Sequence, residues 1–235
     1  MSKEKILRDQ EISVVYSDRD WQILNSKRNR AIDLLEMFAK EGLNPYIYGS
    51  IARGNVHQDS DIDIVFTDQI PSFQIEFLLG KNGFKNYFRE IIMATPLDSL
   101  KLYIYLGELE CITVPLSKLD SKGMEFYDFG GKVNLKQLKS NIRVSGIDKR
   151  LVLIKPTSKG HDEFSIINNE RNAAKVLGIN IETVNERIKV LLKREKHGRT
   201  GVFLKRSIEI DESTEDVLKK LANKKSIIRK KLYKR

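Results

Sequence analysis

The stretch that most constrains the fold is residues 46–67, with the sequence YIYGSIARGNVHQDSDIDIVFT. It begins with three β-forming residues that run directly into Gly49 and Ser50, a pair suited to a tight turn. A second β-rich run follows and carries Asp61 and Asp63, two positions apart. Side chains at positions i and i+2 of a strand point to the same face, so both carboxylates are directed at one point. The stretch predicts a strand, a turn, a short helix, a loop and a second strand bearing two acids.

This pair of acids indicates a particular chemistry. Two carboxylates about 5–7 Å apart on one face repel each other and would be costly in a core. Mg²⁺ favours such oxygen pairs, with water and substrate phosphates completing its coordination shell. The Gly-Ser turn before a helix start offers backbone N–H groups to a phosphate. The combination predicts a site that moves a nucleotidyl or phosphoryl group; the alternative is a strand with solvated aspartates at its edge.

Three short motifs in this stretch also carry a family resemblance. Gly49-Ser50, Arg53-Gly54 and Ser60-Asp61-Ile62-Asp63 resemble the GS…(S)DxD signature of the DNA polymerase β-like nucleotidyltransferase superfamily, in its small, minimal branch. The resemblance implies an α/β (α+β) domain with a mixed sheet flanked by helices. It also implies an enzyme that transfers a nucleoside monophosphate from a nucleoside triphosphate, with ATP as the expected nucleotide and Mg²⁺ or Mn²⁺ as cofactor.

The resemblance assigns roles to individual residues. Asp61 and Asp63 would be catalytic and hold the metal, while Gly49 and Ser50 would bind the nucleotide phosphates. Arg53 would also belong to the nucleotide site, either by supporting the turn or by contacting the phosphates.

A third carboxylate is expected on a neighbouring strand in this superfamily. Residues 101–106 and 109–114 predict two strands joined at Gly107 and Glu108, with the apolar and polar alternation of half-buried strands. Glu110 lies inside the second strand and is the candidate third catalytic and metal-binding carboxylate, with Glu108 as the second choice. A solvated strand glutamate is the alternative reading.

Charge divides the chain into two halves. The net charge is +10, and the sequence gives a net of −4 for residues 1–120 and +14 for residues 121–235. Such a split favours two modules, the second of them facing a polyanion. Lys149, Arg150, Lys155 and Lys159 lie in this basic half and could contact a triphosphate or an acceptor; an ordinary solvated loop is the alternative.

Residues 164–206 resemble the winged helix-turn-helix family. Ala174 is small enough for two helices to approach, and Gly178 suits the left-handed position of the turn between them. A second helix would follow, and HGRTGVFLKR, residues 197–206, would form a hairpin wing. A helical unit that binds protein or dimerises is the alternative. The candidate nucleic-acid-binding residues are Lys189, Lys193, Lys196, Arg199, Lys205 and Arg206.

These patterns predict a division of the chain. A nucleotidyltransferase domain would span residues 1–120, with its core at 26–116, and a connecting, substrate-facing segment would span 121–160. The winged helix-turn-helix would occupy residues 161–210 as a mainly α domain. Residues 211–235 would form a basic helix or tail, because residues 217–235 contain nine lysines and arginines and no acid.

The predicted partner is a nucleic acid, RNA being slightly favoured over DNA, and the ribosome is a further candidate. No apolar run is long enough to span a membrane, the N-terminus has no apolar signal region, and Cys111 alone allows no internal disulfide. We therefore expect a cytoplasmic protein without a membrane partner. The alternative function is a non-catalytic nucleic-acid-binding or ribosome-binding regulator that uses the fold as a nucleotide sensor or scaffold.

Overall fold

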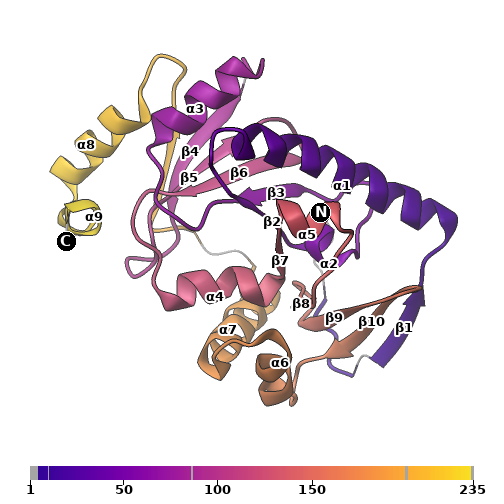
Figure 1. Ribbon diagram of the computed structural model, residues 1–235. Coiled ribbons are helices and arrows are strands. Elements are labelled where there is room, and N and C mark those ends of the chain that lie inside the picture. Colours follow the sequence, from indigo (N-terminus) through magenta and orange to yellow (C-terminus); the bar gives the residue numbers. More distant parts are fainter. Residues whose placement is uncertain (1–4, 10, 86, 199–200, 234–235) are drawn as a thin grey trace.

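The computed structural model describes residues 5–9, 11–85, 87–198 and 201–233, which form a mixed α/β structure (Figure 1). The helices are α1 (Asp18–Ala39), α2 (Ser50–Arg53), α3 (Ser72–Lys81), α4 (Ser121–Gly130), α5 (Leu135–Lys139), α6 (Glu170–Leu177), α7 (Ile181–His197), α8 (Thr214–Lys224) and α9 (Ser226–Tyr233). The strands are β1 (Glu11–Val15), β2 (Tyr46–Tyr48), β3 (Ile62–Val65), β4 (Phe88–Met93), β5 (Lys101–Tyr105), β6 (Glu110–Pro115), β7 (Lys132–Asn134), β8 (Gly146–Ile147), β9 (Val152–Thr157), β10 (Gly160–Ser165) and β11 (Leu204–Ile208).

The larger sheet has seven strands in the order β11-β4-β5-β6-β3-β2-β7. Strands β3 and β6 pair in parallel, and every other neighbouring pair in this sheet is antiparallel. The sheet is therefore mixed, as expected for the N-terminal half. Its two edge strands, β7 and β11, both come from the part of the chain after residue 120.

Helices cover the two faces of this sheet unequally. Helices α1 and α3 lie along one face (Figure 1), and their apolar side chains join those of the strands in the largest core. Helix α1 begins at a capping box in which Ser17 and Asp20 satisfy each other's backbone N–H groups. The opposite face is covered in part by α4, where Val65, Leu119 and Tyr127 form a small separate cluster. We call the first the core face and the second the open face.

The smaller sheet has four strands in the order β1-β10-β9-β8, all antiparallel. Helices α6 and α7 pack with it to form a second apolar core that includes Leu151, Ile166, Ala174 and Val184. This sheet and its helices lie on the α4 side of the larger sheet (Figure 1).

The two sheets do not follow the predicted division at residue 120. Strand β1 comes from the N-terminal segment, yet it pairs with β10 in the smaller sheet. Strand β11 comes from the predicted winged module, yet it pairs with β4 of the larger sheet. Each half of the chain therefore contributes to both sheets, because strand pairing joins segments that are far apart in the sequence.

Two consecutive helices lie where the helix-turn-helix was predicted, but the described residues of the predicted wing do not form a hairpin. Helices α6 and α7 are joined at Gly178, which has a φ of 65° in the left-handed region expected of it. In place of the predicted hairpin wing, Leu204–Ile208 form the edge strand β11 of the larger sheet. The basic tail forms α8 and α9, whose Val217, Ala222 and Ile228 are buried in the largest core.

None of the described helices is both long enough and apolar enough to cross a membrane.

Candidate active site

The glycine-serine turn links β2 to the short helix α2. Gly49 precedes α2 and has a φ of 86°, a backbone conformation that residues with a Cβ rarely adopt. Its N–H donates to the carbonyl oxygen of Gly131 (2.9 Å), and its own carbonyl accepts from the N–H of Arg53 (3.1 Å). Gly54 ends the helix with a φ of 103°. Two glycines thus bend the backbone sharply on either side of four helical residues that start with Ser50.

The two aspartates meet this turn from the neighbouring strand. Asp63 lies in β3 directly opposite Tyr48 of β2, and its carboxylate oxygen Oδ2 lies 4.0 Å from the position a Cβ would take on Gly49. Asp61 immediately precedes β3 and is exposed. The structure therefore brings the Gly-Ser turn and the aspartate pair together on the open face of the sheet.

The electrostatics of Asp63 suit a site for a cation. Burial, followed by the negative charge of Asp61, raises the pKa of Asp63 from 3.8 to about 6, while the positive charge of Lys149 acts in the opposite direction. The two neighbouring carboxylates provide an oxygen donor set that fits a hard divalent ion. In the described parts of the chain, no group of three or more histidine, cysteine or acidic side chains could hold a metal. Substrate phosphates and water would have to supply the remaining ligands of an ion at Asp61 and Asp63.

The predicted third carboxylate, Glu110, is not part of this site. In the parallel pairing of β3 with β6, Glu110 lies opposite Ile62 and therefore shares its face of the sheet, while Asp63 points to the other face. Its carboxylate accepts two hydrogen bonds from Arg30 of α1, at 2.6 and 2.8 Å. Glu108, the second choice, is exposed in the turn between β5 and β6. Glu110 is one residue out of register with Asp63, so the two carboxylates lie on opposite faces of the sheet.

The residue opposite Asp63 on β6 is Cys111. Burial, with the charges of Asp63 and Asp61, raises the pKa of this thiol to about 12. A neutral thiol thus occupies the position on the neighbouring strand where the family resemblance implies a third carboxylate. No local sequence pattern could predict this, because the register of β3 with β6 decides which residue of β6 faces Asp63.

Arg53 is buried and its hydrogen bonds point away from solvent. One Nη1–H donates to the carbonyl oxygen of Gly130 (2.5 Å) and its Nε–H donates to Asn55 Oδ1 (3.0 Å). Burial lowers the pKa of its guanidinium. These contacts fit support of the turn, the first of its two expected roles, because Gly131 next to Gly130 also accepts from Gly49.

A rigid turn brings Lys149 beside the aspartates. The turn runs from Asp148 to Leu151, and Leu151 has a φ of 59°. Arg150 fixes it by donating to Asp148 (2.8 Å) and to Glu163 (2.6 Å), and Glu163 is buried in the smaller sheet. Lys149 itself is exposed and acts electrostatically on Asp63. Of the four basic loop residues singled out in the sequence, Lys149 is placed best for an anionic substrate.

The six basic residues predicted to bind nucleic acid do not form one surface patch. Lys189, Lys193 and Lys196 are exposed on α7. Lys205 and Arg206 lie instead on β11 and form ion pairs with Glu90 (2.9 Å) and Glu212 (2.7 Å). Arg199 lies outside the described residues.

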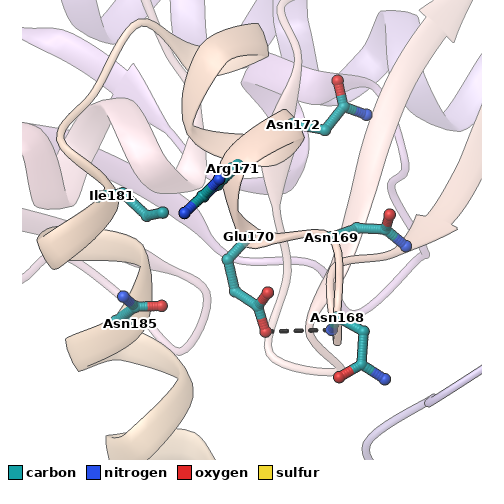
Figure 2. A pocket seen from close by; sticks show the side chains of 7 residues that line it. All are labelled: Asn168, Asn169, Glu170, Arg171, Asn172, Ile181 and Asn185. Carbon is teal, nitrogen blue, oxygen red and sulfur yellow. Dashed lines mark hydrogen bonds between the residues drawn. The ribbon is translucent and has the colours of Figure 1, made fainter.

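Two surface hollows lie away from the aspartates. The first, of about 440 Å³, lies between the start of α6 and the start of α7 (Figure 2). In Figure 2, Glu170 turns back to accept the N–H of Asn168 at 3.1 Å. The second, of about 230 Å³, lies between the end of α1 and β7. Neither hollow is lined by the Gly-Ser turn or by the aspartates. The first is lined by Asn168, Asn169, Glu170, Arg171, Asn172, Ile181 and Asn185.

Comparison with known proteins identifies one part of the chain. Residues 32–98 match the family model of the nucleotidyltransferase domain, a stretch that includes Gly49, Ser50, Asp61 and Asp63. No curated protein and no solved structure matches the chain. The match and the mixed sheet support a nucleotidyltransferase domain in this part of the chain, and domains of this kind generally use a nucleoside triphosphate and a divalent metal ion. The match ends before β6, so it does not extend to Cys111.

Proposed function

We propose that the protein is a metal-dependent nucleotidyltransferase that transfers a nucleoside monophosphate to RNA or to a target associated with nucleic acid. The observation that carries the proposal is the convergence of the Gly-Ser turn with Asp63, whose carboxylate lies 4.0 Å from the Cβ position of Gly49. A phosphate-binding turn beside an aspartate pair suits a nucleotide whose phosphates are also metal ligands.

Asp61 and Asp63 would hold the metal ion. Mg²⁺ or Mn²⁺ would supply neutralisation of the charge that builds up on the triphosphate during the transfer. The ionised carboxylate of Asp63 is required for this, and its raised pKa of about 6 leaves it ionised at neutral pH. Cation binding would also relieve the repulsion between the two carboxylates.

The turn and its neighbours would position the triphosphate. Ser50 and the backbone of the short helix after Gly49 would face the phosphates, and Arg53 would hold the turn from behind through Gly130. Lys149 would add a positive charge on the side of Asp63. In the transfer, an acceptor oxygen bonds to the α-phosphorus, the bond to the β-phosphate oxygen breaks, and pyrophosphate leaves. The proton of the acceptor hydroxyl passes to solvent.

The charge distribution supports a nucleic acid as the acceptor or its carrier. The second half of the chain has a net charge of +14, and α7 exposes Lys189, Lys193 and Lys196. Lysines on one exposed helix give phosphate contacts that do not depend on base sequence. ATP is the proposed donor.

The test compares the wild type with an Asp61→Ala/Asp63→Ala variant. Both are incubated with Mg²⁺, α-labelled nucleoside triphosphates, and total cellular RNA and protein. We expect label transfer by the wild type, and a loss of more than about 100-fold in the variant, beyond the usual cost of substitutions outside the metal shell.

Asp59→Ala serves as the matched control, because Asp59 is exposed in the same loop and precedes the motif. It should transfer label like the wild type. Equal transfer by the double variant would remove both aspartates from the mechanism.

One observation favours a second function, a non-catalytic regulator that binds nucleic acid or the ribosome and senses a nucleotide. Cys111 stands opposite Asp63 where the third carboxylate is expected, and such a carboxylate helps to deprotonate the acceptor. A sensor would bind ATP and Mg²⁺ without transferring label. A Cys111→Asp variant would then gain transfer, whereas Cys111→Ser, the control without a charge, would not. Transfer by the wild-type protein would exclude the sensor.

A further inference from the structure

A line of side chains leads away from Asp63 across the open face of the larger sheet. Asp63 on β3 lies opposite Cys111 on β6, Cys111 lies opposite Tyr105 on β5, and Tyr105 lies opposite Phe88 on β4. Residues directly opposite each other on neighbouring strands share a face. Three strand spacings place Phe88 roughly 14 Å from Asp63 along the sheet.

Neighbouring aromatic rings in this line are inclined by 30° or less to each other. Tyr105 and Phe88 have ring centroids 5.9 Å apart and an interplanar angle of 30°. Tyr103, two residues before Tyr105, continues the row at 6.4 Å with an angle of 18°. We call these three residues, Phe88, Tyr103 and Tyr105, the aromatic platform.

The outer part of the platform, Phe88 and Tyr105, is not enclosed by the packing of the fold, whereas Tyr103 is largely buried. Among the described residues, none of the three apolar clusters includes any of its rings. Phe88 is 48% exposed, and Tyr105 is partly exposed. Helix α4 covers the same face farther along, where its Tyr127 packs with Val65. Large aromatic side chains that the core does not use are typical of a binding surface.

The charge beside the platform does not repel an anion. Glu90 is the acid that shares this face on β4, and it is buried with only 5% of its side chain exposed. It pairs with Lys205 of β11 at 2.9 Å, so its charge is compensated. The side chain of Lys205 is 58% exposed and lies at the rim of the platform. A flat aromatic row with a cation at its rim matches the two parts of a nucleotide, a base and a phosphate.

The position of the platform in line with the aspartates indicates which kind of molecule binds to it. An acceptor hydroxyl that attacks the α-phosphorus beside Asp63 must come from a molecule that lies on the open face. On that face, the strand register places the aromatic rings in line with Asp63. Bases stack on aromatic side chains whatever their sequence, because every base has a π-face.

We propose that the aromatic platform binds the bases of a single-stranded nucleic acid and holds its end at Asp63 as the acceptor of the transfer. This proposal deepens the proposed function. The role of the nucleic acid as acceptor rests on the proposed function, whereas the binding of the bases does not depend on catalysis.

Binding is measured by fluorescence anisotropy with labelled single strands of oligo(U) and oligo(dT) of about 12 nucleotides, without nucleoside triphosphate. We expect Phe88→Ala and Tyr105→Ala each to weaken binding by about 5- to 150-fold, the usual cost of losing one base–aromatic stack. Tyr105→Phe should keep the wild-type affinity, because it keeps the ring. A preference for one of the two strands distinguishes RNA from DNA.

The matched control is Phe77→Ala. Phe77 is 67% exposed on α3, a helix that packs on the core face, so this variant loses a phenylalanine of similar exposure away from the platform. It should bind like the wild type. Equal loss in Phe77→Ala and Phe88→Ala, or wild-type binding by both Phe88→Ala and Tyr105→Ala, would overturn the proposal.

The Asp61→Ala/Asp63→Ala variant separates this proposal from the proposed function. Wild-type binding of the oligonucleotide by this variant supports the platform whether or not the wild type transfers label. Label transfer to protein alone, with no oligonucleotide bound, would overturn the platform and leave the transferase standing.

Discussion

The two faces of the seven-stranded sheet are made by alternate residues of the same strands, yet they bury different side chains. On β5, Leu102 and Ile104 point to the core face and are fully buried, whereas Tyr103 and Tyr105 point to the open face. On β6, Ile112 lies on the core face and Cys111 beside Asp63. One face therefore stabilises the fold, which leaves the other free to carry charged and aromatic groups that packing alone would not select.

The largest effect on stability should come from the core face. Ile104→Ala removes a fully buried side chain from the centre of the sheet and should lower the free energy of unfolding by about 2–5 kcal/mol, measured by urea denaturation. Tyr105→Phe, at the next residue on the open face, should change it by less than about 0.5 kcal/mol. Equal losses would mean that both faces are packed alike.

A gain of stability should come from the open face. The pKa of Asp63 is raised from 3.8 to about 6 in the folded protein, so its ionised form opposes folding at neutral pH. In metal-free buffer at pH 7, Asp63→Asn should raise the free energy of unfolding by about 1–3 kcal/mol. The gain should shrink as the pH falls from about 6 to 4, where the aspartate becomes protonated in both states.

Thermal or urea unfolding across that pH range checks this prediction. Asp59→Asn, in the exposed loop before the motif, should show no such gain. A lower free energy of unfolding for Asp63→Asn than for the wild type at pH 7 would contradict this prediction and would show that the aspartate side chain stabilises the fold.

The smallest effect should come from Glu110, the acid that the register assigns to the core face. Glu110→Gln loses a partly exposed ion pair with Arg30 and should cost no more than about 1 kcal/mol, with label transfer unchanged. A loss of transfer of more than about tenfold in this variant, at wild-type stability, would place Glu110 in the active site and contradict its assigned face.

Most features that could be predicted from the sequence depend on local patterns. The alternation in residues 101–106, the Gly-Ser turn with its two aspartates, and the glycine between α6 and α7 each depend on neighbours a few residues apart. These elements appear where they were expected, because backbone preference and apolar period act locally.

Long-range pairing explains what the sequence could not predict. The pattern in residues 204–208 suits a strand, but nothing local tells whether it folds back as a wing or adds to β4. The residue of β6 that faces Asp63 could not be predicted for a related reason. A shift of one residue between β3 and β6 exchanges Glu110 and Cys111 at that position. The aromatic platform likewise depends on the register of three strands.

The edge strands of the larger sheet also bear on how the chain is made. While the ribosome is still translating, β2 and β4 present open ladders until residues 132–134 and 204–208 emerge from the exit tunnel. Unpaired strand edges invite contact with other nascent chains. A chain whose translation ends before residue 204 would therefore contain Asp61 and Asp63 while the β4 edge of its larger sheet is still unpaired.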